Sequence, residues 1–159
     1  MKVDLNKIKE LRDKTGVSIA DCRATLEKAG GDLEKALQFL KERGAEVAEK
    51  KSSRAIGAGV VNSYIHHTLT SGATVIVGTE TDFVARNPEF QEFAHNVAQQ
   101  VVATGTQVVE SLLKEPWIKD ETKTVGDLVN EQIAKFGENI QIQKVQKFEV
   151  GEQSEKISK

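Results

Sequence analysis

The feature that most limits the fold is a change in the spacing of hydrophobic residues near residue 55 of this 159-residue chain. Up to Gly44 they recur every three or four residues, which is typical of amphipathic helices. From Ala55 the chain continues as AIGAGVVNSYIHHTL and ATVIVGTE, two extended patterns joined by a turn predicted near Ser71-Gly72. The two patterns in this order predict an α+β protein, in which a helical module precedes a small antiparallel sheet covered by helices.

Three short helices are predicted in the first part of the chain, each with its own start and stop signals. Thr15-Gly16 ends the first helix, and Ser18 caps the second with Asp21 as a capping-box acid. Asp32 caps the third helix and Gly44 is expected just past its end. The three apolar stripes can share one small core; their members are Leu5, Ile8 and Leu11, then Ile19, Cys22, Leu26 and Ala29, then Leu33, Ala36, Leu37 and Leu40.

The second part of the chain predicts helices followed by a last strand. Asn87 and Pro88 begin one helix, VVESLLKE predicts further helical turns, and PWIKDETK is expected to be a connector. Another helix runs from its cap Thr124 to Gly137. NIQIQKVQKFEV predicts a strand whose alternation slips by one around Lys144, which indicates a bulge. The buried positions expected on the two main helices are Phe90, Phe93, Ala94, Val97 and Val101, and Val125, Leu128, Val129, Ile133 and Phe136.

The segment AEVAEKKSSR, residues 45–54, is charged and has few large apolar side chains, so it is interpreted as a linker that is helical at first. We therefore divide the chain into a three-helix module at 1–50, an α+β core domain at 51–152 and a flexible tail at 153–159.

Composition argues against several classes of function. The formal net charge is −2, so no global charge favours binding to nucleic acid or to an anionic membrane. The single cysteine, Cys22, allows no internal disulfide, which suits a reducing compartment. No apolar run approaches the roughly 20 residues of a membrane helix, and the charged N-terminus has no signal-peptide core. The sequence therefore predicts a cytoplasmic protein.

The stretch TETDFVARNPEF, residues 79–90, places two acids and an aromatic residue where a strand ends. In a strand, the carboxylates of Glu80 and Asp82 would share a face at roughly 6.5–7 Å, a spacing suited to an inverting glycosidase. A sugar site usually also has aromatic platforms, and this chain has one Trp and one Tyr, both elsewhere in the sequence. Solvated acids at a strand end are therefore favoured. For Phe83, the generic expectation is packing under its own helix.

No other residues assemble an active site. His66 and His67 are adjacent in a predicted strand and point to opposite faces, and His95 lies off the apolar stripe of its helix, so a zinc site is not predicted. Cys22 falls on a buried stripe, which favours core packing over nucleophilic chemistry. The phosphate-binding patterns GxxxxGK[ST] and GxGxxG do not occur. We therefore expect no catalytic residue, no metal ligand and no cofactor.

Several segments, in order, resemble those of translation elongation factor Ts, the nucleotide exchange factor for elongation factor Tu. TDFVARN resembles the signature of that family, and KELRDKTGVSIADCRATLEKAGGDLEKALQFLKERGA resembles its N-terminal three-helix bundle, which is similar to ubiquitin-associated (UBA) domains. NSYIHH, PWIKDETKTV, KFGENIQI and KFEVGE resemble further family segments. The resemblance covers the chain from about Lys2 to Glu152.

The resemblance implies a guanine-nucleotide exchange factor, not an enzyme with a chemical step. Tu holds GDP through backbone N–H groups of its phosphate loop and a Mg²⁺ ion, and the TDFV loop of the family presses in beside that site. Carried over, Phe83 would be an apolar wedge and Asp82 would disturb the contacts that support Mg²⁺. Thr81 and Val84 would set the shape of the loop. The resemblance therefore reverses the generic expectation and predicts that Phe83 faces a partner.

The resemblance also implies a second contact with Tu. The UBA-like module would bind the nucleotide domain of Tu through Lys9, Arg12, Ile19 and Ala20, the last two standing where many members have Met. The expected partner is elongation factor Tu, GDP-bound and nucleotide-free, without direct nucleic acid or membrane contact. A homodimer paired through the sheets is a further expectation. It would be noncovalent, because Gln146 stands where the family's short form can carry a cysteine.

Three alternatives stay open. Family members commonly have a long helical stretch where this chain has only Gly105 to Glu115, so the chain could bind Tu and exchange poorly. An adaptor whose UBA-like module binds a protein partner without exchange predicts that Phe83 is dispensable. A glycosidase using Glu80 and Asp82 predicts turnover without any protein partner.

Overall fold

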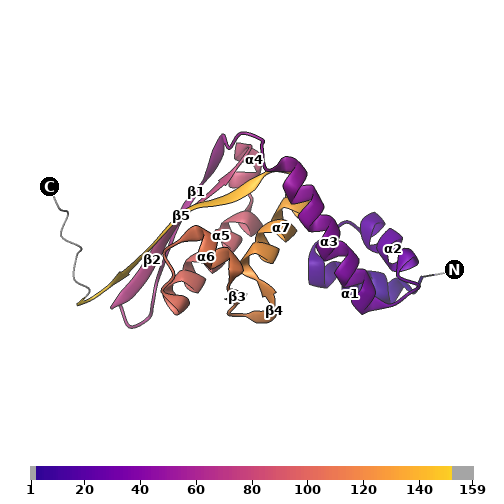
Figure 1. The fold of residues 1–159 in the computed structure, drawn as a ribbon, viewed down its shortest axis with the longest axis horizontal. Coiled ribbons are helices and arrows are strands. Elements are labelled where there is room, and N and C mark those ends of the chain that lie inside the picture. Colours follow the sequence, from indigo (N-terminus) through magenta and orange to yellow (C-terminus); the bar gives the residue numbers. More distant parts are fainter. Residues whose placement is uncertain (1–2, 152–159) are drawn as a thin grey trace.

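In the computed structural model, which describes residues 3–151, three helices pack together at one end of an elongated molecule (Figure 1). They are α1 (Leu5–Thr15), α2 (Ile19–Lys28) and α3 (Leu33–Lys51). The predicted caps at Ser18 and Asp32 are present, and Gly16 ends α1 with a left-handed φ of 68°. The buried side chains form one small cluster of Ile8, Leu11, Cys22, Leu26, Ala29, Ala36 and Leu40.

The environments of Leu5 and Gly44 differ from the prediction. Leu5 is 80% exposed, and Val3 instead packs against the cluster. Gly44 does not end α3, which continues to Lys51. Gly44 is buried where α3 crosses α7 (Val125–Phe136), and a Cβ atom there would lie 3.7 Å from the backbone oxygen of Asn130. Tertiary contact at this crossing outweighs the cost of about 1 kcal/mol that glycine carries inside a helix.

The sheet has three antiparallel strands in the order β1 (Ala58–Ile65), β2 (Ser71–Thr79) and β5 (Ile140–Glu149). The hairpin turn lies at residues 66–70, so the prediction that placed it near Ser71-Gly72 is wrong. Leu69, in this turn, has a positive φ of 60°. The predicted bulge is present: Ile76 pairs with Lys144 and Val77 pairs with Ile142, so one residue of β5 has no pairing partner on β2.

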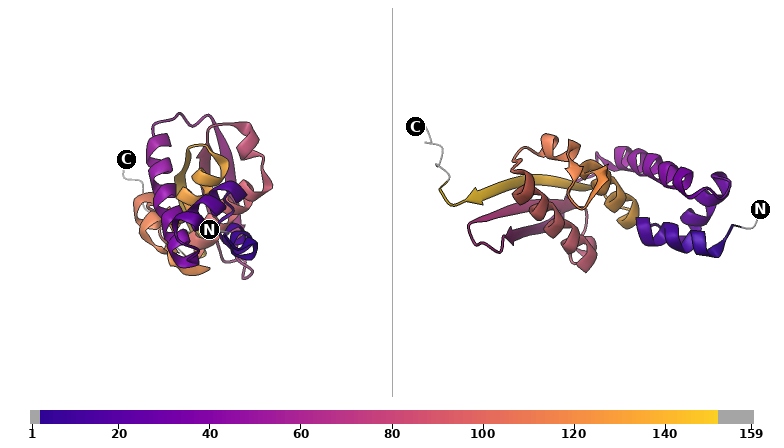
Figure 2. Two further views of the ribbon diagram at one scale, coloured as in Figure 1. Left: turned by 90° about the vertical axis from the view of Figure 1, so that its right-hand side faces the viewer. Right: turned by 90° about the horizontal axis from the view of Figure 1, so that it is seen from below.

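Helices cover one face of the sheet (Figure 2). They are α5 (Pro88–Thr104), α6 (Val109–Lys114) and α7, and the single turn α4 (Asp82–Ala85) lies at the end of β2. Asn87 caps α5, and Thr124 and Asp127 form a complete capping box on α7. The predicted stripes are buried in one large cluster, except that Phe136 is only half-buried. The mixed α+β class is thereby confirmed.

The segment PWIKDETK is not a plain connector. It forms a small hairpin of β3 (Pro116–Trp117) and β4 (Asp120–Thr124). The fully buried amide of Gln100 organises it, because its Nε2 donates to Pro116 O at 3.0 Å and its Oε1 accepts from Ile118 N at 2.9 Å. A buried amide that satisfies two backbone groups at long range leaves no local sequence signal.

Helix α3 connects the two parts of the molecule. Val47 and Ala48 near its end pack against the large cluster of the sheet domain, whereas its first half belongs to the small cluster. The predicted boundary at residue 50 falls in its last turn, and the division into 1–50 and 51–152 stays a prediction. The predicted tail, 153–159, lies outside the described residues. Within residues 3–151 every helix is too short or too polar to span a membrane.

Candidate functional site

The TDFV sequence forms the single helical turn α4 between β2 and α5 (Figure 1). Ala85 N donates to Thr81 O at 3.2 Å, and Arg86 N donates to Asp82 O at 3.0 Å. Thr81 occupies the N-cap position with an extended backbone, but its side chain makes no capping hydrogen bond. The turn therefore begins without the local support that caps the longer helices.

Two adjacent side chains of α4 have opposite environments. Phe83 is 91% exposed, more than any other large hydrophobic side chain in residues 3–151. Val84 is 8% exposed and belongs to the large hydrophobic cluster. The generic expectation that Phe83 packs under its own helix is wrong, because Val84 and the fully buried Phe90 fill the core at this place. This single turn thus presents Phe83 to solvent, while Val84 anchors the turn in the hydrophobic core.

The two acids of the motif do not act as a pair. The Asp82 side chain is 75% exposed, and its carboxylate lies 3.9 Å from the Arg86 guanidinium. Glu80 is turned to another part of the chain: its Oε1 accepts from Asn139 N at 2.7 Å and lies 3.6 Å from Arg54 Nη1. With one carboxylate solvated and the other engaged with backbone, the site lacks the two facing acids that a glycosidase needs.

The main polar support of α4 comes from Glu138, in the turn between α7 and β5. Its Oε2 accepts from Thr79 Oγ1 at 2.8 Å, from Glu80 N at 3.1 Å and from Thr81 N at 3.0 Å. Its Oε1 accepts from Thr81 Oγ1 at 2.5 Å. One carboxylate thus binds the three residues that lead into α4.

The protonation state of Glu138 follows from these bonds. Burial acts to raise the pKa of this carboxyl group, but hydrogen bonds from Thr81 and Thr79 and from the backbone of Thr81 and Glu80 outweigh it. The net result is a pKa below the ordinary glutamate value of 4.5. Donors directed at a carboxylate stabilise its charged form, so Glu138 is ionised at neutral pH.

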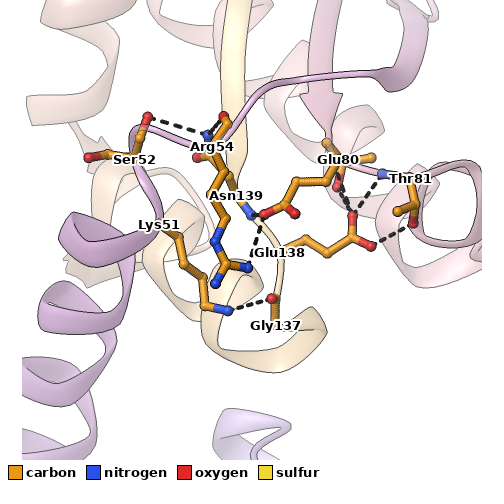
Figure 3. A network of polar contacts seen from close by, with 9 residues as sticks. Lys51, Ser52, Arg54, Glu80, Thr81, Gly137, Glu138 and Asn139 are labelled. Atoms are coloured by element: carbon orange, nitrogen blue, oxygen red, sulfur yellow. Dashed lines mark hydrogen bonds and ion pairs between the residues drawn. The ribbon is translucent and has the colours of Figure 1, made fainter.

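The next residue, Asn139, extends these contacts to the end of α3 (Figure 3). It is 1% exposed, and its Nδ2 donates to Arg54 O at 2.8 Å and to Ser52 O at 3.4 Å. Lys51 Nζ donates to Gly137 O at 2.5 Å. Lys51 and Arg54, which the sequence placed in a solvated linker, therefore contact the turn that supports α4.

The four residues predicted on the N-terminal module all lie at its surface. Lys9 and Arg12 are exposed on α1, and each directly follows a buried residue, Ile8 and Leu11. Ile19 and Ala20 are exposed in the first turn of α2, and Ile19 retains 55% of its side-chain surface. Ile19 was assigned both to the helix stripe and to a partner surface, and its exposure removes it from the small core.

The histidines take part in hydrogen bonds and ring contacts. Tyr64 Oη lies 3.0 Å from His66 Nδ1, and His95 Nδ1 lies 3.1 Å from Asn62 Oδ1. The ring of Tyr64 meets that of His95 edge to face at 5.6 Å. Among residues 3–151, no three His, Cys, Asp or Glu side chains gather as a metal site would require.

Two crevices of about 360 and 500 Å³ lie between the N-terminal helices and the sheet domain, away from α4. Glu131 lines both, and its burial raises its pKa despite Lys123, whose Nζ lies 3.1 Å away. Lys41 Nζ pairs with Asp127 at 3.1 Å across the second crevice. The Lys41–Asp127 pair joins α3 to the sheet domain, whereas Lys123 and Glu131 pair within the sheet domain.

Sequence reasoning missed Glu138 and Asn139. Both lie in the KFGENIQI segment, which carries part of the resemblance, but their partners are 57 or more positions away along the chain. The only local signal was the Gly137 stop that precedes them. Helix α4 and the residues that support it are thus brought together by the fold alone.

Comparison with known proteins gives a consistent result. The sequence model of a family described as "Elongation factor TS" matches residues 80–158. Elongation factor Ts of Thermotoga petrophila is 35% identical over 195 aligned positions, covering 96% of this chain and 98% of the relative. The Synechococcus protein of the same name is 36% identical, covering 98% of this chain and 72% of the relative.

Elongation factor Ts of Clostridium botulinum is 40% identical over 148 positions, which cover 93% of this chain but 48% of the longer relative. The alignment with the Thermotoga relative spans 195 positions against 159 residues here, so that relative carries residues this chain lacks. The identity nevertheless extends over nearly the whole of both chains. This protein therefore belongs to the elongation factor Ts family of translation elongation factors.

Proposed function

We propose that this chain is a guanine-nucleotide exchange factor that binds elongation factor Tu in its GDP-bound and nucleotide-free states. The observation that carries the proposal is Phe83, 91% exposed on a short helix whose next residue is buried. An aromatic side chain held out in water has a large apolar area to bury in a partner. We infer the partner from family membership, and such a factor would work in the cytoplasm, where translation takes place.

The proposed mechanism uses Phe83 as a wedge. Burying a phenylalanine side chain yields about 1.5–3 kcal/mol, which can offset the separation of packed elements of Tu beside its nucleotide. Asp82, solvated in the free chain, would then approach the groups that orient the Mg²⁺ ligands of Tu. Displacing such supporting groups strongly weakens metal binding. Once the metal has left, Tu binds GDP less tightly. The residues of this chain contribute no bond-making step, so it is not an enzyme in that sense.

Binding of this chain and binding of GDP must oppose each other to the same extent. If the chain weakens GDP binding to Tu, GDP weakens binding of the chain by the same factor, typically about 5–150-fold. The exchange factor therefore accelerates both directions. Excess GTP over GDP would determine which nucleotide rebinds.

The UBA-like module, residues 1–50, is proposed as a second contact with the nucleotide domain of Tu. Lys9, Arg12, Ile19 and Ala20 are all exposed on α1 and α2, which supports this assignment. When one contact has formed, the second contact carried by the same chain has a higher effective concentration. In this proposal the module supplies affinity and α4, in the core domain 51–152, supplies exchange.

Release of a fluorescent GDP analogue from Tu, followed by stopped flow, tests the proposal. Phe83→Ala should slow release at saturation by about 10- to 150-fold, which corresponds to the lost burial energy. Leu69→Ala is the matched control, since Leu69 is 79% exposed in the turn at the opposite end of the hairpin. Equal acceleration by wild type and Phe83→Ala would refute the wedge. Binding without any acceleration would favour the adaptor.

A noncovalent homodimer is proposed in addition. Ile65, Gly72 and Phe148 form one row across the three strands, on the sheet face opposite the helices. Ile65 and Phe148 are 61% and 52% exposed, so this face offers apolar surface to a second copy. Gln146 is exposed on β5 and cannot form a disulfide. Sedimentation that finds only monomer at about 50 μM, the scale of weak association, would exclude the dimer.

A further inference from the structure

Helix α4 does not hold its own shape. It has four residues, and its N-cap residue Thr81 makes no side-chain bond to the helix. A single turn gains too few hydrogen bonds to offset the entropy of fixing its backbone. The orientation of Phe83 must therefore be determined by contacts made from outside α4.

The strongest of these outside contacts are the four hydrogen bonds accepted by Glu138. They come from the hydroxyls of Thr79 and Thr81 and the backbone N–H groups of Glu80 and Thr81. Three of these bonds go to Oε2 and one goes to Oε1, so both oxygens of the carboxylate are engaged. Thr79 is fully buried, which ties the carboxylate to the end of β2 and to the entry of α4 together.

The residues on either side of Glu138 contact the end of α3. Gly137 O accepts from Lys51 Nζ, and Asn139 Nδ2 donates to the backbone oxygens of Ser52 and Arg54. Three consecutive residues thus bind the helix that leads from the UBA-like module and the strand that leads into α4 (Figure 3).

We propose that the turn 137–139 acts as a clasp between α3 and α4, and that Glu138 is the positioning residue that sets the direction of Phe83. This inference rests on the proposed exchange function, and it deepens it by naming what makes the wedge effective. The clasp orders α4 before Tu is met, so that ordering does not have to take place during exchange. It also keeps the wedge in a fixed relation to the helix that carries the module.

A pair of variants separates the position of α4 from the stability of the fold. Glu138→Ala removes all four acceptors. Glu138→Gln keeps the shape: its amide oxygen can accept the bonds now made to Oε2, and its amide nitrogen can donate to Thr81 Oγ1. Glu115→Ala is the matched control, because Glu115 also accepts hydrogen bonds, from Thr106 Oγ1 and Gln100 Nε2, but lies between α6 and β3.

Two quantities are measured on the full-length chain. The first is protection of the Glu80 and Thr81 amides from hydrogen exchange, read by NMR. The second is release of fluorescent GDP from Tu as a function of the concentration of the chain. Glu138→Ala should lose the protection and lower the maximal release rate by about tenfold or more, because small misplacements of a reacting group have effects of that size. The half-saturating concentration should change by less than about threefold. Glu138→Gln should restore both quantities, and Glu115→Ala should leave both unchanged.

The outcomes distinguish this inference from the proposed function. Protected amides and an unchanged release rate in Glu138→Ala would overturn the clasp, as would an equal loss of rate in Glu115→Ala. If the wild-type chain does not accelerate release at all, the proposed exchange function fails. In that case, loss of amide protection in Glu138→Ala alone would still identify Glu138 as the residue that positions α4, and retained protection would refute it.

Discussion

Helices α2 and α4 both expose an apolar side chain in their first turn, Ile19 and Phe83, but they are supported in different ways. Helix α2 has ten residues, a serine cap and the fully buried Cys22 and Leu26 in its own module. Helix α4 has four residues, and its polar support comes from Glu138, which lies 57 positions from Thr81. One surface is built by its own sequence, and the other is built by the fold.

This difference determines how each surface responds to change. A surface supported by neighbours in sequence should survive changes in the other domain. A surface supported across the fold should respond to residues that never touch Tu. The predictions below test this contrast, in order of decreasing effect on free energy.

The largest effect is expected from Leu26→Ala in the small cluster. Leu26 is fully buried, and removing its side chain should destabilise the module by about 2–5 kcal/mol. A cluster of only seven buried residues provides little stability, so α1–α3 should unfold at a lower urea concentration than the sheet domain. Circular dichroism and NMR would monitor this unfolding. Amides of β2 should stay protected at urea concentrations that unfold α2. Loss of both at the same concentration would show that the two clusters form one cooperative unit.

Val84→Ala tests the support beneath the wedge. It removes two methyl groups from the core, which should cost about 1.5 kcal/mol or more. GDP release should slow although Phe83 is intact, because α4 loses its buried anchor. Val97→Ala is the control: Val97 is 2% exposed in the same cluster but lies on α5. Equal effects of the two variants on the release rate would contradict the special dependence of α4 on Val84.

Ile19→Ala should change affinity without changing the maximal rate. Ile19 is 55% exposed, so the free energy of unfolding should change by less than about 0.5 kcal/mol. The half-saturating concentration in GDP release should rise about three- to tenfold, or about 0.7–1.4 kcal/mol. Leu5→Ala, at a residue 80% exposed on α1 and not assigned to Tu, serves as the control. A lower maximal rate in Ile19→Ala would mean that the module takes part in exchange itself.

The smallest effect is expected from acid pH. Burial opposes ionisation of Glu138, but hydrogen bonds led by those of Thr81 lower its pKa below 4.5. A hydrogen bond from the Ser18 hydroxyl is the main cause that lowers the pKa of Asp21 below 3.8. Each carboxylate contributes stability above its unfolded-state pKa, and this stability is lost as the pH falls through the lower folded-state pKa.

Amide shifts of Thr81 and Asp21 should therefore stay constant from pH 6 to pH 8 and change only in acid. For Glu138 the change should begin below 4.5, and in Glu138→Gln the Thr81 shift should no longer titrate. The Asp21 shift should titrate in both proteins. A Thr81 transition above pH 5 in the wild-type chain would show that the hydrogen bonds do not outweigh burial.

Local rules predicted most of the helical structure. Asn87 with Pro88 and Thr124 with Asp127 occur where the structure has its caps. All five residues predicted for the stripe of α5 are buried, because a helix that packs on a sheet repeats its apolar contact every turn; the buried Ala98 and Gln100 were not predicted. The slip in β5 was visible because the alternation of buried residues changes at the bulge.

What the sequence did not predict depends on contacts between distant segments. Gly44 looks like a helix end until α7 is placed against it, and Ser71-Gly72 looks like a turn until Leu69 is seen to take the positive φ. Glu138 resembles any acid that follows a helix. Its role appears only when the ends of β2 and α7 are adjacent, which is a property of the sheet order.

Because α3 packs against α7 at Gly44, a change of the crossing angle there would move the N-terminal end of α3. The helix has 19 residues, and the eleven steps from Leu33 to Gly44 extend about 16 Å at a rise of 1.5 Å per residue. A tilt of α3 by about 10° at this crossing would move Leu33, at its N-terminal end, by about 3 Å. A Cβ atom at residue 44 would meet Asn130 O at an ordinary 3.7 Å, so alanine fits, whereas a larger side chain would push the helices apart. A larger side chain at this one position should therefore change the angle between α3 and α7, and with it the distance between α4 and the N-terminal end of α3.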